Sequence, residues 1–432
     1  MPILQPIQAI FYDRPADGDI SAKIAPPYDV LDEQPKRRLL DRDSHNIVAI
    51  DLPVTPPKTV GPDSAYEQAG QCFEQWLEEG ILERSGDPVL VAYEQKFEVG
   101  GADYARRGLF AVVEAEPFNR AGGGVFRHEM TIPTGTEDRL KLMEATSAQL
   151  SPVFGVYADP EHDVAQLLDP VYRTDPDLRG TTTHDQVEHR CWVLDDPTLT
   201  SKLEAIFRDR DVYIADGHHR YTTALNYQQA HGDAAKPSGC LMVLVCLSDP
   251  GMIVLPTHRL ITGLGQFSLD ELAQKLAADG RASLAPISRS DLTADSVPEL
   301  LQSSGHHAML LLGPGPGEAA VFSTTSQDPL ADLMPDKPSV WRTLDVAVAH
   351  ELLIDRILRP HFGEGSPGVK YTADLGELQR LQLAEPGALG VVLQPTTLEA
   401  VCAVAAADEV MPPKSTFFFP KLATGLVIHN LR

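Results

Sequence analysis

The clearest local pattern in the chain lies at residues 212–230, which read VYIADGHHRYTTALNYQQA. The apolar residues 212–215 predict a buried strand. The dipeptide at 216–217, Asp-Gly, predicts a tight turn, because glycine tolerates backbone angles that other residues avoid. From His219 or Arg220 the residues favour a helix, which Gly232 is expected to end. A strand, a tight turn and a helix start leave free backbone N–H groups that converge on one spot and can hold an anion.

Four polar or charged side chains follow this strand within five residues, namely Asp216, His218, His219 and Arg220. Such side chains are unfavourable in a hydrophobic core, because burying them without partners costs free energy. We therefore predict that this is the active-site turn. The Gly217 backbone and Arg220 would bind phosphate, Asp216 would hold a magnesium ion or position a histidine, and both histidines are catalytic candidates.

A second dense polar stretch, Arg127-His128-Glu129, is predicted to lie in a loop or at a strand end. A guanidinium, an imidazole and a carboxylate in three neighbouring residues suit substrate binding or proton transfer. The alternative is a solvated charged loop. The helix expected to start at Glu137 carries Arg139, a further candidate for binding phosphate or substrate.

Near the N-terminus, the segment 24–30 reads IAPPYDV. Its two prolines hold the backbone extended, so that Asp29 is presented at a fixed place. Two interpretations remain open from these residues. Asp29 or Asp32 could cap the helix expected near 31–41, or Asp29 could be a catalytic base.

The second half of the chain adds further binding candidates. The strand expected at 252–255 leads into His258 and Arg259, which could face the same pocket as the turn. The tail at 411–425 carries two lysines and three hydroxyl groups between prolines, and a lysine beside two hydroxyls is a credible oxyanion clamp. No glycine loop precedes it, so it is not a Walker motif. The candidates in the tail are Lys414, Ser415, Thr416 and Lys421.

Length and composition limit the class of protein. A chain of 432 residues is too long for one ordinary core, and 43% hydrophobic with 22% charged residues is typical of a globular protein. The shift from dense buried strands to more polar sequence predicts two domains, 1–262 and 263–432. The five scattered cysteines are expected to be reduced and mostly buried.

The charge and hydropathy pattern excludes several partners. With 61 acidic and 36 basic residues the net charge is −25, which repels the phosphate backbone of nucleic acids. No uncharged apolar run reaches the roughly 18 residues that a membrane span needs. The first residues lack the basic start and long apolar stretch of a signal peptide, so a cytoplasmic location is expected.

Taken together, several motifs resemble a bacterial domain-of-unknown-function family, numbered one thousand and fifteen, over nearly the whole chain. The motifs are PPYDV at 26–30, His128 with DRL at 138–140, SPVF at 151–154, DGHHRY at 216–221, and MPPKST at 411–416 with Pro420-Lys421. A more distant resemblance joins DGHHRYTTA at 216–224 to the phosphate-binding turn of the ParB and sulfiredoxin superfamily. Within it, the turn is most similar to that of the free-serine kinases, which phosphorylate the hydroxyl of free L-serine with a nucleotide or pyrophosphate.

These resemblances imply an α/β (α+β) fold, with a ParB/sulfiredoxin-like mixed-sheet catalytic domain and a second α/β domain whose tail returns to the site. They also imply a small-molecule phosphotransferase that uses Mg²⁺ and ATP, ADP or pyrophosphate. Phosphoryl transfer needs cations on the donor phosphates and a carboxylate to take the hydroxyl proton. Arg127, Lys414 and Lys421 would gather around the phosphate, and Asp29 or Glu129 would be the base.

Two other functions remain open. A phosphate-ester hydrolase would use nearly the same polar groups, with His218 or His219 as nucleophile or acid. A nucleotide-binding switch module would bind its ligand with slow or no turnover. The expected partner is a small molecule bearing phosphate, with no nucleic acid and no membrane, and a homodimer is left open.

Overall fold

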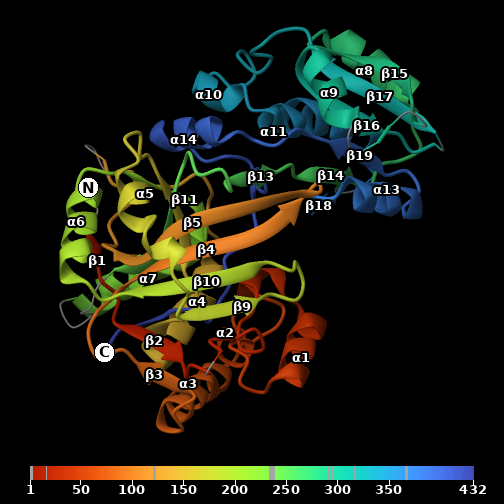
Figure 1. The fold of residues 1–432 in the computed structure, drawn as a ribbon. Coiled ribbons are helices and arrows are strands. Elements are labelled where there is room, and N and C mark those ends of the chain that lie inside the picture. Colours follow the sequence, from red (N-terminus) through yellow and green to blue (C-terminus); the bar gives the residue numbers. More distant parts are fainter. Residues whose placement is uncertain are drawn as a thin grey trace. The chain divides into compact units, whose positions relative to one another are not determined.

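The chain folds into two compact units. The computed structural model describes residues 3–15, 17–119, 123–232, 239–289, 292–293, 296–315, 317–364 and 368–432. Unit 1 comprises Met1–Ile253 and Pro420–Arg432, and unit 2 comprises Val254–Phe419. Both combine sheets with helices (Figure 1), so the predicted α/β fold class with a mixed sheet is confirmed.

Unit 1 is built on a nine-stranded mixed sheet whose main path runs β6-β11-β8-β12-β5-β4-β10-β9, with β1 paired to β5. The parallel pairs are β11 with β6 and β12 with β8, and the other pairs are antiparallel. The strands are β1 (Leu4–Gln5), β4 (Leu90–Val99), β5 (Ala102–Val113), β6 (Val125–Phe126), β8 (Val153–Tyr157), β9 (Leu178–Thr181), β10 (Glu188–Leu194), β11 (Val212–Asp216) and β12 (Cys240–Cys246).

A smaller antiparallel sheet in unit 1 has the order β3-β2-β21-β7. Its strands are β2 (Ala9–Tyr12), β3 (Leu82–Arg84), β7 (Ala148–Gln149) and β21 (Ile428–Asn430). Since β21 pairs with both β2 and β7, the end of the chain is part of unit 1. This pairing keeps Lys421 in the same unit as the predicted active-site turn.

In unit 1, the helix expected to start at Glu137 starts at Pro133 instead, because proline is tolerated in the first turn of a helix. The helix α3 (Asp63–Glu78) ends before Gly80, where the chain turns with φ 72° and then enters β3. The helices are η1 (Tyr28–Val30), α1 (Glu33–Arg42), α2 (Val48–Asp51), α3 (Asp63–Glu78), α4 (Pro133–Thr146), α5 (Asp163–Leu168), η2 (Val171–Arg173), α6 (Pro197–Phe207) and α7 (His218–His231).

Unit 2 has a six-stranded antiparallel sheet, ordered β15-β17-β16-β19-β14-β18. Side chains alternate across it: Met309 and Leu311 join one core, and Leu310 and Leu312 join another. The first core contains α8 and the π-helix, and the second contains α9 and α13.

The elements of unit 2 are β14 (His258–Ile261), α8 (Leu269–Asp279), β15 (Ala282–Ser288), α9 (Ser296–Ser303), β16 (His306–Leu312), β17 (Glu318–Thr324), α10 (Ser339–Arg342), α11 (Asp345–Ala347), the π-helix η5 (Val348–Leu358), α12 (Arg359–Phe362), β18 (Val369–Thr372), α13 (Leu375–Ala384), β19 (Leu389–Val392) and α14 (Leu398–Ala406). The short strands β13 (Ile253–Leu255) and β20 (Phe417–Phe419) pair with each other where the chain passes between the units.

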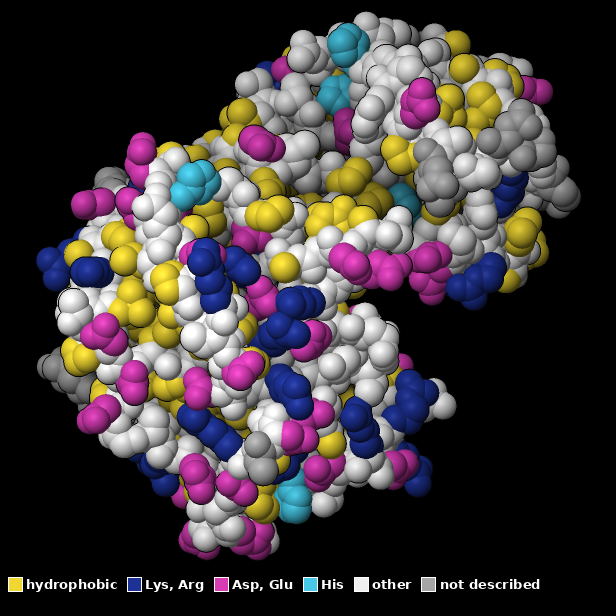
Figure 2. Space-filling model, viewed as in Figure 1, with side chains coloured by type: hydrophobic (Ala, Val, Ile, Leu, Met, Phe, Trp, Pro, Cys, Tyr) yellow, Lys and Arg dark blue, Asp and Glu magenta, His cyan; other side chains and the backbone are white. Residues whose placement is uncertain are grey.

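Charged side chains of both signs are interspersed over the face seen in Figure 2. Within the described ranges, no helix is long and apolar enough to cross a membrane.

Candidate phosphate-binding site

The predicted active-site turn joins the end of β11 to the start of α7. Asp216 is the last residue of the strand, and Gly217 stands before the helix with φ 94°. A Cβ at Gly217 would lie 3.0–3.1 Å from the guanidinium of Arg220, so glycine suits this position by its backbone angle and by space. The first N–H groups of α7 have no partner within the helix, as expected for an anion-binding helix start.

Asp216 holds two cations at this turn. Its Oδ2 lies 3.0 Å from Nη2 of Arg220, and its Oδ1 lies 2.9 Å from Nζ of Lys421. Arg220 also donates to the carbonyl oxygen of Pro152. Burial alone would raise the pKa of Asp216, but Lys421 and Arg220 outweigh it and hold this pKa well below its usual range. The carboxylate is therefore ionised and fixes both cations in place.

This arrangement does not fit the predicted magnesium role of Asp216. A ligand to Mg²⁺ needs an oxygen that faces the ion, whereas both oxygens of Asp216 already face cationic side chains. Across the described part of the chain, no group of three or more His, Cys, Asp or Glu side chains is placed to hold a metal ion.

The two histidines of the turn connect α7 to the loop that carries the second polar stretch. The backbone N–H of His128 donates to Nε2 of His218 over 3.4 Å, and that of Ile132 donates to Nε2 of His219 over 3.0 Å. Burial lowers the pKa of His218 and of His128 to about 3, so both rings are neutral at pH 7. With their Nε2 lone pairs engaged, His218 and His219 fit a positioning role better than the predicted catalytic one.

This contact brings Glu129 to the turn. Its Oε2 lies 3.8 Å from Nδ1 of His218, and its side chain is 42% exposed, so a substrate can reach it. The guanidinium of Arg127 lies 5.0 Å above the ring of Phe118. Its buried Nε has no hydrogen-bond partner among the described residues, so this cation keeps bonding capacity for a ligand.

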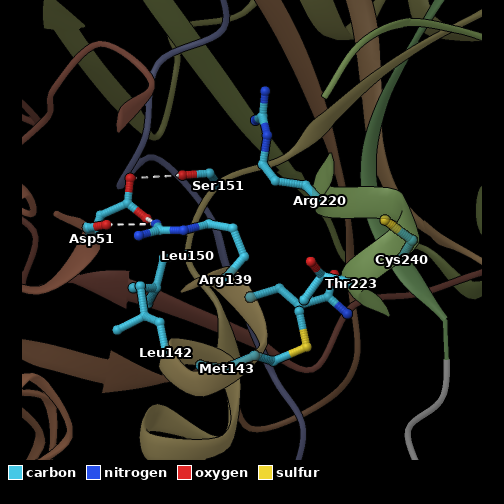
Figure 3. A pocket seen from close by; sticks show the side chains of 11 residues that line it. Asp51, Arg139, Leu142, Met143, Leu150, Ser151, Arg220, Thr223 and Cys240 are labelled. Atoms are coloured by element: carbon cyan, nitrogen blue, oxygen red, sulfur yellow. Dashed lines mark hydrogen bonds and ion pairs between the residues drawn. The ribbon is translucent and has the colours of Figure 1, made fainter. Parts of the chain in front are cut away.

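Arg139 and Arg220 line one small cavity of about 40 Å³. Figure 3 shows Arg139 reaching toward Asp51 and Ser151 on one side, with Thr223 and Cys240 on the other. Arg139 Nη1 donates to the carbonyl oxygen of Asp51 over 2.6 Å, and its Nε donates to Asp138 over 2.8 Å. Both predicted phosphate-binding arginines thus line this cavity, but Arg139 is held in a buried network and Figure 3 shows Arg220 pointing away from it.

Asp29 lies apart from this network in its own pair. Its Oδ2 is 3.3 Å from Nζ of Lys58. The neighbouring Tyr28 is buried, with the guanidinium of Arg139 3.9 Å from its ring centroid. Asp32, not Asp29, caps α1, since its side chain accepts the N–H of Gln34 over 3.0 Å. The residue that caps α1 is therefore Asp32, and the role of Asp29 as a catalytic base stays a prediction.

Five predicted binding residues belong to unit 2, namely His258, Arg259, Lys414, Ser415 and Thr416. There, His258 Nδ1 accepts the N–H of Leu393 over 3.3 Å, and Arg259 donates to the carbonyl oxygen of Thr257 over 2.7 Å. The hydroxyl of Ser415 donates to the carbonyl oxygen of Pro412 over 2.6 Å. Their role at the turn of unit 1 stays a prediction.

Arg106 is a positioning residue that the sequence reasoning missed. It is 1% exposed, pairs across the strands with Gln95, and donates to the carbonyl oxygen of Pro420. Gln95 donates to the carbonyl oxygen of Lys421 over 3.0 Å. The pair therefore anchors the backbone that carries Lys421. The available signal was its place in β5, where Arg106 shares a face of the strand with the apolar Phe110 and Val112.

At the start of α7, on a mixed α/β scaffold, an ionised carboxylate is thus flanked by two cations. The chain belongs to the family described as Protein of unknown function (DUF1015), whose model matches residues 4–347. The predicted family membership is thus confirmed. No curated protein matches the chain.

Several solved structures are similar to this chain. A free serine kinase in complex with AMP is 14% identical, with TM-score 0.31, over 68% of this chain and 83% of that one. A conserved hypothetical protein from Pyrococcus furiosus is 14% identical, with TM-score 0.31, over 69% and 88%. A C-terminally truncated SbnI from Staphylococcus aureus is 11% identical, with TM-score 0.34, over 72% and 84%. Similarity at this level says nothing about the activity of this chain.

Proposed function

We propose that this chain is a small-molecule phosphotransferase, a kinase of free L-serine or a similar hydroxyl compound. The observation that carries the proposal is the Asp216 carboxylate between Lys421 and Arg220 at the start of α7. Phosphoryl transfer is catalysed mainly by positioned positive groups and N–H donors around the phosphates. Arg127, with its unengaged Nε, adds a third cation on the neighbouring loop.

The proposed roles follow from the surroundings of each group. The donor is ATP, ADP or pyrophosphate. Its phosphates are bound by Lys421, Arg220 and the N–H groups of α7. Glu129 takes the proton of the acceptor hydroxyl, because its carboxylate is exposed and lies next to the neutral His218. Asp29 is the less favoured base, since it already pairs with Lys58. The serine-like acceptor rests on the resemblance of the turn DGHHR to that of the free-serine kinases.

The hydrolase alternative is supported less well. A histidine nucleophile needs a free ring lone pair, whereas His218 and His219 each accept a backbone N–H at Nε2. The two functions differ in their products, since a kinase makes phosphoserine from a donor, whereas a hydrolase releases phosphate without one.

Phosphorus NMR of the purified protein tests this directly. L-serine and magnesium are added with ATP, ADP or pyrophosphate in separate samples, and a parallel sample contains phosphoserine alone. The proposal expects a phosphoserine resonance with at least one donor. Free phosphate released from phosphoserine alone would instead identify a hydrolase, and no reaction in any sample would favour the nucleotide-binding switch.

A further inference from the structure

Unit 1 contains a second cavity, of about 330 Å³, that the proposed phosphotransfer does not use. It lies between the strands β5, β8 and β12 and the helix α5. Its apolar wall includes Leu109, Leu244, Val164 and Leu168, which belong to one core cluster together with Tyr157. The cavity has exposed residues such as His162 and Ala165 in its lining, so it opens to the surface and a small molecule can enter it.

The side chains that line this cavity are separate from those that hold Lys421 at the phosphate-binding turn. Neighbouring residues of a strand point to opposite faces. On β5, Arg106 packs over Phe154 with its guanidinium 4.5 Å from the ring, whereas Arg107 lines the cavity. On β8, likewise, Phe154 faces Arg106 and Tyr157 lines the cavity. The two sites thus share strands but not side chains.

The charged groups of the cavity are already paired. Arg107 Nε lies 3.0 Å from Glu94, and its guanidinium lies 4.6 Å above the ring of Tyr172. Asp249 accepts the N–H of Gly251 over 2.8 Å and that of Arg107 over 3.2 Å. The lining holds one arginine and one carboxylate, Arg107 and Asp249, each already bonded, and is otherwise mostly apolar, so it favours an uncharged ligand.

Tyr157 supplies a polar contact for such a ligand. The residue is 3% exposed and lines the cavity, and no hydrogen bond joins its hydroxyl to any of the described residues. Burial raises its pKa well above the usual range, so the hydroxyl stays protonated and can donate. The hydroxyl of Tyr172, by contrast, already donates to the carbonyl oxygen of Gly108 over 3.1 Å.

We propose that this cavity is a second ligand site, which takes an uncharged molecule with a flat apolar body and one hydrogen-bonding group that pairs with the hydroxyl of Tyr157. A cavity of ~150 Å³ binds benzene, so 330 Å³ has room for a two-ring body. The site is independent of the phosphotransferase proposal, since none of the residues that line it belongs to the phosphate-binding turn.

Fluorescence titration of the full chain with 2-naphthol and with naphthalene tests the proposal. Both probes should bind saturably to one site, and 2-naphthol should bind more tightly. Tyr157→Phe should weaken 2-naphthol by about 5- to 10-fold, the worth of one neutral hydrogen bond, and leave naphthalene unchanged. Tyr104→Phe, on β5 outside the cavity, is the control and should change neither.

Filling the mouth of the cavity gives a second test that does not depend on a buried substitution. Ala165 is exposed on α5 and lines the cavity, whereas its exposed neighbour Gln166 does not. Ala165→Trp should weaken both probes at least tenfold, and Gln166→Trp should not. Absence of saturable binding to the wild type, equal affinities in the two tryptophan variants, or a Tyr157→Phe variant that keeps the full 2-naphthol affinity would overturn the proposal.

Discussion

Nζ of Lys421 lies 2.9 Å from Oδ1 of Asp216, although 205 residues separate them in sequence. The pair exists because β21 pairs with β2 and β7, and because Arg106 and Gln95 hold the backbone at residues 420–421. Lys421, near residue 432, thus supplies a cation to the turn between β11 and α7 in the middle of the sequence.

The first prediction concerns this cation. Lys421→Met should lower the rate of phosphoserine formation by about 10²–10³-fold, because a preorganised positive group at the transferred phosphate is lost. Affinity for inorganic phosphate, measured by calorimetry, should fall by about 1–3 kcal/mol. Lys337→Met breaks a comparable pair with Glu409 in unit 2 and is the matched control. If both substitutions changed the rate and the phosphate affinity equally, Lys421 would not be part of the phosphate-binding site.

The second prediction separates the two candidate bases. Glu129→Gln should lower kcat by about 10²–10⁴-fold with little change in the donor KM, because a general base is lost while the phosphate contacts remain. Asp29→Asn should leave kcat within a few-fold, since Asp29 pairs with Lys58. Steady-state kinetics of both variants distinguishes the two candidate bases. A larger loss of kcat in Asp29→Asn than in Glu129→Gln would make Asp29 the base.

The third prediction tests the positioning role of His219. His219→Ala removes the acceptor for the N–H of Ile132 and should cost about 0.5–1.5 kcal/mol of unfolding free energy, measured with urea, because water can reach this exposed site. Activity should fall with it, because the loop that carries Glu129 loosens. His219→Gln restores an acceptor and should recover much of both losses. A glutamine variant that folds normally but is as inactive as the alanine variant would show that the imidazole itself takes part in the reaction.

The fourth prediction concerns pH and stability. In the folded chain the pKa of His128 and of His218 is about 3, whereas the unfolded value is about 6.5. Between these values the unfolded chain binds more protons, so the free energy of unfolding decreases as pH falls from about 6.5 towards 3. The slope is up to about 1.4 kcal/mol per pH unit for each histidine.

Asp216 acts in the same direction at lower pH. Its folded pKa is depressed, so its contribution to stability is present above the unfolded pKa of about 4 and is lost on further acidification. Urea unfolding at pH 7 and pH 5 measures the histidine effect, and His218→Gln should make the dependence shallower. An unchanged slope in that variant would mean that His218 is not held neutral.

Local features of the structure were predictable from the sequence. Strand β11, the glycine turn and α7 follow from an apolar run, a turn dipeptide and a helix-forming stretch that lie next to one another. The hairpin of β4 and β5 follows from Gly100-Gly101, which both adopt positive φ. Asp216, Arg220 and Lys421 were all found as candidates, because charged residues beside strand ends and prolines stand out from core sequence.

Features that depend on distant pairing were not predictable. The sequence offered both Lys414 and Lys421 as candidates and did not show which of them pairs with Asp216. Lys421 does so because β21, close to it in sequence, pairs with β7 in unit 1. The backbone contacts that engage His218 and His219 come from a loop about ninety residues away. Arg106 was missed because charged residues within a strand usually indicate a solvated face. Asp103 and Arg107 of the same strand are indeed exposed, whereas the backbone at Pro420 covers Arg106.

The central claim is that the Asp216–Lys421–Arg220 turn handles the transferred phosphate. Phosphorus NMR of L-serine, magnesium and each donor, run with wild type and with Asp216→Asn, tests it most directly. The account predicts a growing phosphoserine resonance with the wild type and its loss, by at least 10²-fold in rate, in a variant that is still folded without urea although it has lost two ion pairs. Phosphoserine formed at equal rates by both proteins would contradict the account.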